Sequence, residues 1–189
     1  EVKSENGLKR YHFKHQNLKA IEEEPGAVNS FDYAPYFTAS TLRTYDDIGS
    51  LYWLHAKPRT ENSAAVKKLA LSLTKEVQDK KKKAEILYYW VQKNIRYVSD
   101  IIERGGLIPN PADSILEKRV GDCKDHASIL SALLSAVGID ASPALINLGT
   151  SYTISGAPTT SPFNHVITYV AEFDLYLDTT SQYSRFGQL

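Results

Sequence analysis

The 189-residue sequence contains no methionine and only one cysteine, and its 22 basic residues balance its 22 acidic residues. A single cysteine forms no internal disulfide, leaves the redox compartment open and excludes the cysteine-rich zinc modules. The formal net charge of zero gives no reason to expect a nucleic acid or an anionic membrane as a partner. No apolar run approaches the roughly 20 residues that span a bilayer. Without methionine, the chain is expected to be a processed or trimmed piece from which a signal peptide could have been removed.

A chain of this length can bury one hydrophobic core and carry an appended segment. Residues 1–40 show no helical period, although Tyr11 and Phe13 alternate with polar neighbours as in a weak strand. The apolar stretch FDYAPYFTAS, residues 31–40, also lacks a period. We expect this stretch to lie against the domain that follows or against a domain outside this sequence.

Helical patterns begin after this segment. Thr44, followed three residues later by Asp47, resembles a capping box, and Pro58 ends the helix that it opens. The spacing of apolar residues predicts two further helices, over residues 61–77 and 80–98.

A loop over residues 99–112 separates these helices from the next element. Asn110 and Pro111 are predicted to be the N-cap and first residue of a short helix that ends near Lys118. The four lysines at 80–83 indicate a solvated helix end rather than an anion site, because adjacent residues point all round a helix axis.

The central stretch of the sequence is GDCKDHASILSALLSAVG, residues 121–138, which contains the only cysteine. Apolar residues follow at steps of four and three, as on one face of a helix, at Cys123, Ala127, Leu130, Leu134 and Val137. Gly138 is predicted to stop the helix. The N-terminal end of a helix favours a thiolate, and its free N–H groups can hold an oxyanion. The alternative is a buried structural cysteine.

The character of the sequence changes after Gly138. Strands are predicted over residues 144–148, 163–171 and 174–178, with the last two forming a hairpin. Helices first and strands last favour an α+β domain over a doubly wound parallel sheet.

A cysteine nucleophile needs a base within hydrogen-bond reach, and the base needs an orienting group. Three of the five histidines, His12, His15 and His55, belong to the N-terminal part. His126 lies about 60° from Cys123 around the predicted helix, close to the thiol but poorly fixed for proton transfer. His165 begins a β-branched strand after a loop and is the stronger candidate, although it could simply make an ordinary strand hydrogen bond.

The orienting group is predicted to be Asp178, which follows His165 by 13 residues and ends the next strand. Two adjacent antiparallel strands would bring these side chains together. Asp174 is the rival carboxylate, but it belongs to the predicted turn. An aspartate at a strand end is also commonly a turn or cap residue.

These motifs, taken in order, resemble the transglutaminase-like superfamily of papain-like folds. The resemblance covers about residues 44–185 and rests on the strings YYWVQKNIRYV, RVGDCKDHASILSALLSAVGIDA, FNHVITYV and LYLDTT. It implies a papain-like core in which a helical half packs on a small antiparallel sheet. Family members often have proline after the aspartate, where this chain has Thr179.

The resemblance implies acyl transfer, with Cys123 as nucleophile, His165 as general base and acid, and Asp178 orienting His165. The substrate would be a protein or peptide, and hydrolysis of its amide bonds is the favoured reaction. The alternatives are transfer of the acyl group to an amine, as in a transglutaminase, and a non-catalytic scaffold or binding module that keeps the fold.

The oxyanion would be held by the backbone N–H of Cys123 and by one further donor. Tyr97, Trp90 or an amide of the loop 99–112 could supply it; Tyr97 is favoured, because it is predicted to end a helix that leads into this loop. Alternatively, Tyr97 and Trp90 are core aromatics.

No cofactor or metal is implied. Asp122 and Asp125 are interpreted as helix-capping residues, although a metal site from Asp122, His126 and a third residue is an alternative.

By the same resemblance, residues 41–189 are the catalytic core, and residues 1–40 are the tail of a β-rich N-terminal domain that packs on it. Most of that domain would lie outside this sequence. Bacterial relatives of this layout are often exported, which favours the periplasm or the cell exterior.

Overall fold

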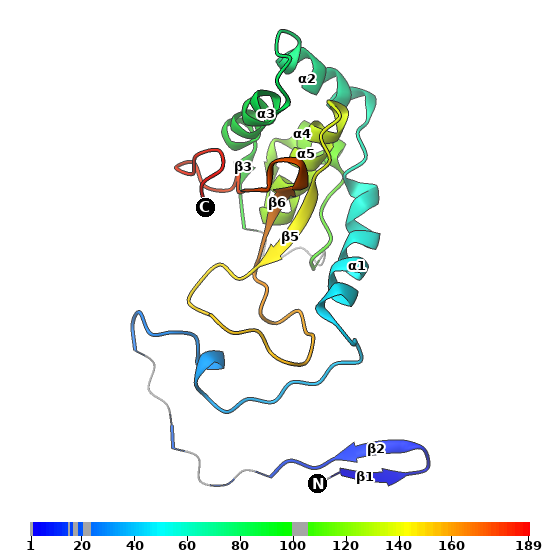
Figure 1. The fold of residues 1–189 in the computed structure, drawn as a ribbon, viewed down its shortest axis with the longest axis vertical. Helices are drawn as coiled ribbons and strands as arrows, with labels where there is room; N and C mark the ends of the chain where they lie inside the picture. The colour runs from blue at the N-terminus through cyan, green and yellow to red at the C-terminus, as the bar shows by residue number, and fades with distance from the viewer. Residues whose placement is uncertain (1, 15, 17–18, 21–23, 100–105) are drawn as a thin grey trace.

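The computed structural model describes residues 2–14, 16, 19–20, 24–99 and 106–189, so His15 and residues 100–105 of the loop 99–112 lie outside the described residues. Helices pack around and against a three-stranded antiparallel sheet, which makes the fold α+β as predicted (Figure 1). Among the described residues, no helix is both long enough and apolar enough to cross a membrane.

The cysteine helix α5, Cys123–Ala136, is the centre of the core. Asp122 caps its N-terminus in a capping box with Asp125, and Gly138 follows its C-terminus with a φ of 74°. The helix is buried on more than the one predicted face, since Ile129 and Leu133 are also fully inaccessible. The reason is that α5 contacts both the sheet and three other helices.

The first helices partly follow their predicted bounds. Helix α1, Tyr45–Ala56, has the predicted capping box between Thr44 and Asp47, and the short 3-10 turn η2, Lys57–Arg59, follows it. Helix α2, Ala64–Thr74, begins later than predicted. The Ser63 hydroxyl accepts a hydrogen bond from the Val66 amide and so acts as the N-cap.

The prediction of a helix through residue 98 was wrong at its C-terminal end. Helix α3 covers Lys80–Asn94, and the chain then becomes extended as β3, Arg96–Tyr97. This short strand pairs in parallel with β4, Val120–Gly121, next to the cysteine helix. Local helical spacing continued to residue 98, but tertiary pairing of the backbone overrode it.

The predicted N-cap Asn110 was also wrong. Helix α4, Ala112–Lys118, has Pro111 at its N-cap position. Asn110 is instead bound to Asp125 of α5, through its backbone amide at 2.7 Å and its side-chain amide at 3.1 Å. These bonds tie the loop to the start of the cysteine helix.

The main sheet has the order β5-β6-β7, formed by β5 Ser142–Ile146, β6 His165–Val170 and β7 Leu175–Leu177. Both pairs are antiparallel, and the pair of β6 with β7 is the predicted hairpin. A 3-10 turn, η3 Ala171–Phe173, joins β6 to β7. It ends at Asp174, which has a φ of 50°. Strand β5 starts two residues before its predicted start because it follows β6 to the pair of Ser142 with Tyr169.

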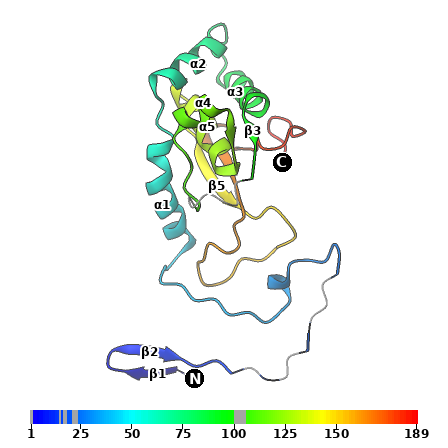
Figure 2. The same ribbon diagram turned by 180° about the vertical axis from the view of Figure 1, so that it is seen from behind.

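The N-terminal segment contains a hairpin that the sequence analysis missed. Strands β1, Val2–Glu5, and β2, Leu8–Tyr11, pair antiparallel across Asn6 and Gly7, which both have positive φ. An Asn-Gly pair is a strong hairpin signal because this turn needs two residues that tolerate positive φ. Figures 1 and 2 show the hairpin apart from the helices and the main sheet.

The segment after the hairpin reaches the loop between β5 and β6. A 3-10 turn, η1 Ser30–Asp32, places the Asp32 carboxylate against the amides of Tyr152 and Thr153, at 2.9 and 2.7 Å. The aromatic side chains of this segment remain largely exposed, with Phe37 at 62%. The expected contact with the following domain is therefore made mostly by polar groups.

Candidate active site

The Cys123 side chain lies at the first turn of α5 and is half-buried. It packs against a small apolar cluster that is separate from the main core and contains Tyr52, Ala127 and Val166. The cluster brings together α1, α5 and β6, three elements far apart in the sequence. The thiol therefore lies where a helix N-terminus, another helix and a strand of the main sheet meet.

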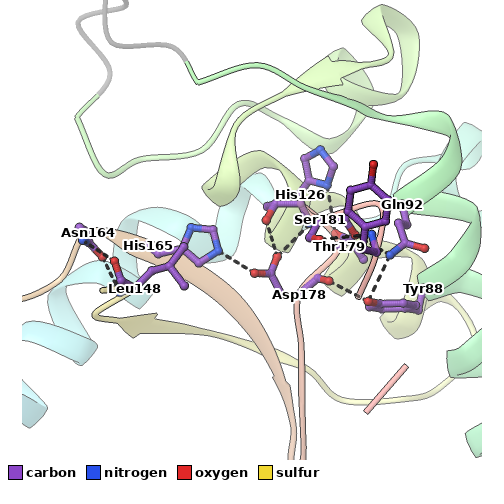
Figure 3. A network of polar contacts seen from close by, with 11 residues as sticks. Tyr88, Gln92, His126, Leu148, Asn164, His165, Asp178, Thr179 and Ser181 are labelled. Carbon is purple, nitrogen blue, oxygen red and sulfur yellow. Dashed lines mark hydrogen bonds and ion pairs between the residues drawn. The ribbon is translucent and has the colours of Figure 1, made fainter. Parts of the chain in front are cut away.

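His165 is the first residue of β6 and is 6% exposed. Its Nε2 atom lies 2.9 Å from Oδ2 of Asp178 (Figure 3). The side chain of Cys123 is the second polar neighbour that acts on the ring. The bonds to Asp178 and Cys123 raise the pKa of His165 to about 9, although burial opposes the shift. The structure thus brings together the three residues that the sequence analysis singled out.

Both oxygens of the Asp178 carboxylate are engaged. Oδ2 faces His165, while Oδ1 accepts hydrogen bonds from the Thr180 amide and hydroxyl at 2.9 and 2.7 Å. Burial acts to raise the pKa of Asp178, but the bonds from His165 and Thr180 outweigh it and leave the pKa below its usual range. The rival Asp174 accepts from the Tyr169 hydroxyl at 3.0 Å in the exposed turn.

Helix α3 holds the backbone that carries Asp178. The Tyr88 hydroxyl donates to the Asp178 carbonyl at 2.8 Å, and the Gln92 side chain donates to the Ser181 carbonyl at 2.6 Å. Tyr88 and Gln92 are four residues apart and therefore lie on one face of the helix. The sequence analysis missed this role, because a tyrosine and a glutamine at helical spacing carry no sign of which distant carbonyl they bind.

His126 is 1% exposed, and its ring bonds to Thr179. Its Nδ1 lies 3.0 Å from the Thr179 hydroxyl, and its Nε2 has no hydrogen-bond partner among the residues that the structure describes. Burial lowers the pKa of His126 to about 4, so the ring is neutral near pH 7. His126 therefore links the cysteine helix to the residue after Asp178 (Figure 3).

Two tyrosines lie close to Cys123. Burial, followed by the negative charge of Cys123 and Asp122, raises the pKa of Tyr97, whose ring also packs edge-on against His126 at 5.8 Å. The same causes raise the pKa of Tyr52 on α1. The sequence analysis missed Tyr52, because the spacing marked it only as a helix residue 71 positions before the cysteine.

Trp90, the other aromatic candidate, packs against the main core, with the Arg119 guanidinium 4.7 Å above its ring. A role for Trp90 at the oxyanion stays a prediction, and Tyr97 is the candidate that lies near the thiol.

The acidic residues flanking Cys123 make local contacts. Asp122 caps α5 and forms an ion pair with Lys124, and Asp125 accepts from Asn110. Gly121 is required here, because a Cβ at this position would lie 2.5 Å from Cβ of Asp125. Within the described ranges, no group of three or more histidine, cysteine or acidic side chains could hold a metal ion.

The arrangement can generate and use a nucleophile without a cofactor. A histidine lies beside the only thiol and bonds to a carboxylate, which is the combination of nucleophile, base and orienting group. The thiol also lies at a helix N-terminus, where the first N–H groups lack partners within the helix.

Comparisons with known proteins agree with the fold. A family model described as the transglutaminase-like superfamily matches residues 67–170. The crystal structure of a "putative protease" from Parabacteroides distasonis superposes with a TM-score of 0.57 at 19% identity, covering 69% of this chain and 26% of that one. A "putative cysteine protease" from Cytophaga hutchinsonii gives a TM-score of 0.48 at 19% identity, covering 67% and 42%. This chain thus spans less than half of either protein. No curated protein sequence matches it.

Proposed function

The chain belongs to the transglutaminase-like superfamily, and on this premise we propose that it is a cysteine-dependent enzyme that hydrolyses amide or peptide bonds. The observation that carries the proposal is His165, which bonds to Asp178 and lies beside Cys123. A lone buried cysteine with a structural role would not need a histidine that is itself oriented by a buried carboxylate.

The raised pKa of His165 favours an imidazolium at neutral pH, and an imidazolium beside Cys123 stabilises the thiolate. The thiolate attacks the carbonyl carbon of the substrate and forms a tetrahedral intermediate. The backbone N–H of Cys123 and a second donor, for which Tyr97 is the nearest candidate, would hold the oxyanion.

The intermediate collapses when the C–N bond breaks and His165 gives its proton to the leaving amine. The acyl group stays on the sulfur as a thioester. His165 then takes a proton from water, the resulting hydroxide attacks the thioester, and the thiolate leaves with the carboxylic acid as product. Asp178 keeps the ring in the tautomer and orientation that both proton transfers need.

An amine could replace water in the second half of this reaction and make the protein a transferase. A fluorescent primary amine added during turnover separates the two, because only a transferase incorporates it efficiently into the acyl product. We also propose that residues 1–40 belong to a domain that precedes the core, residues 41–189, in the full-length protein.

The test is the rate of Cys123 alkylation by iodoacetamide as a function of pH. The thiol is the only one in the chain, so the signal has one source. We expect a reactive plateau that extends well below pH ~7 in the wild type and is lost in His165→Ala. The exposed His55 offers a matched control, and His55→Ala should keep the plateau. A single titration near pH ~8.5, unchanged in His165→Ala, would refute the enzyme and favour the scaffold.

A further inference from the structure

A pocket of about 340 Å³ lies between α1, β5 and the loop that precedes β6. The side chains that form its walls include Tyr45, Tyr52, Trp53, Leu145 and Phe163. None of the side chains lining it carries a charge. Its volume falls in the range of pockets that hold a small ligand or a large side chain.

The pocket adjoins the thiol. Its wall residue Tyr52 belongs to the apolar cluster against which Cys123 packs, and two more, Trp53 and Leu145, pack against the same cluster. Leu145 also lies opposite Val166 in the sheet, one residue from His165. A group bound in the pocket would therefore contact the same cluster of side chains as Cys123.

Contacts among its own walls keep the pocket open. The rings of Tyr45 and Phe163 meet edge to face, with centroids 5.9 Å apart. The Tyr45 hydroxyl donates to the Ser155 carbonyl at 2.8 Å, which fixes the loop before β6 to the start of α1. Such aromatic walls, fixed in advance, are suited to burying an apolar group with little ordering cost.

We propose that this pocket binds an apolar side chain, aromatic or branched, of the residue next to the scissile carbonyl. This inference rests on the proposed function and adds to it a substrate class: peptides with a large apolar residue beside the bond that is cleaved. Binding in the pocket would remove that side chain from water and place the carbonyl over Cys123.

Gly49 provides a way to fill the pocket. It lies on α1, lines the pocket, and a Cβ built on it would meet no atom within 4 Å. Leucine at this position would therefore extend into the open space without a clash, and it is also the better helix former. Ser50 is exposed on the same helix and outside the pocket lining, so Ser50→Leu adds the same side chain in the wrong place.

The experiment measures how fast dipeptidyl chloromethyl ketones alkylate Cys123, in the wild type, Gly49→Leu and Ser50→Leu. Three acetylated reagents are compared: glycyl-glycyl, phenylalanyl-glycyl and glycyl-phenylalanyl. Each rate is divided by the rate with iodoacetamide, which carries no side chain and reports the reactivity of the thiol itself. Circular dichroism checks that each variant is folded.

In the wild type, we expect the glycyl-phenylalanyl reagent, whose phenylalanine carries the reactive carbonyl, to react about tenfold faster than the glycyl-glycyl and phenylalanyl-glycyl reagents. Gly49→Leu should abolish this preference, and Ser50→Leu should keep it. An activated thiol with no preference for phenylalanine would overturn the pocket alone, as would a preference that survives in Gly49→Leu. A thiol without the low-pH plateau towards iodoacetamide would overturn the proposed function instead, and the pocket with it.

Discussion

The two sides of Cys123 are built from different chemistry. The polar side consists of buried or half-buried hydrogen-bonding groups that contact one another or α3, namely His126, His165, Asp178, Thr179 and Thr180. The aromatic side consists of the uncharged residues around the pocket, including Tyr45, Gly49, Tyr52 and Phe163. The polar side is closed and nearly fully bonded, whereas the aromatic side keeps open space.

This difference predicts that the two sides have separate roles in catalysis and in substrate binding. A buried polar group is costly unless it is bonded, so changing one member of the polar side leaves its partners unsatisfied. A change in an open apolar wall leaves no polar group unsatisfied, so it alters only which substrate side chains fit the pocket. Chemistry is therefore expected to depend on the polar side and substrate choice on the aromatic side.

The largest effect is expected from Cys123→Ser, which removes the thiol, the proposed nucleophile that lies between the two sides. Serine has nearly the same shape but is not ionised by this histidine, so hydrolysis of a fluorogenic peptide library should fall to background. The melting temperature should change by less than a few degrees, because the thiol is only half-buried. Retained hydrolysis in this variant would refute the assignment of the nucleophile.

Asp178→Asn tests the polar side directly. The amide spoils the tautomer and orientation of His165, and the rate of peptide hydrolysis should fall by roughly three to four orders of magnitude. The matched control is Asp174→Asn, because Asp174 is on the same hairpin but its carboxylate accepts from Tyr169 in the turn. If Asp174→Asn lowers the rate and Asp178→Asn does not, the wrong carboxylate has been chosen.

The two buried histidines should limit stability in opposite directions of pH. The folded pKa of His165 is raised from 6.5 to about 9, so its stabilisation is complete below pH 6.5 and is lost as the pH rises through 9. The folded pKa of His126 is lowered to about 4, so between pH 6.5 and 4 the unfolded chain binds a proton that the folded protein does not, and stability falls as the pH falls. Each change corresponds to about 3 kcal/mol.

The free energy of unfolding, measured with urea between pH 4 and 10, should therefore have a maximum near pH 6.5. His165→Gln should remove the alkaline decrease, and His126→Gln should remove much of the acid decrease. An alkaline decrease that is unchanged in His165→Gln would contradict the raised pKa of this histidine.

The smallest effect is expected from Thr179→Val, which removes a bond beside Asp178 and leaves the shape of the side chain nearly unchanged. His126 would then lose its bond at Nδ1, and stability should fall by about 1–3 kcal/mol. Hydrolysis should slow by about tenfold, with a larger change in kcat than in KM, because the backbone that carries Asp178 is less firmly held.

Thr179→Ser keeps the hydroxyl and serves as the control for the loss of the bond. It should restore most of the stability and rate that Thr179→Val loses. If both variants behave alike, the contact between His126 and Thr179 does not position Asp178.

Features encoded within a few residues could be predicted from the sequence. The capping boxes at Thr44 and Asp122, the cysteine at a helix start and the hairpin before Asp178 all follow from spacings that local geometry fixes. Those spacings, together with the resemblance that they support, also singled out the three residues that the structure brings together, whose catalytic roles remain a prediction.

Only the tertiary structure decided the features that join distant segments. The change to a strand after Asn94, the bond from His126 to Thr179 and the place of Tyr52 beside Cys123 all depend on partners at least 20 residues away. The pocket likewise has walls from α1 and from β5, nearly 90 residues later in the chain. Local propensity carries no information about such partners, because packing and pairing of the backbone select them only once the core has formed.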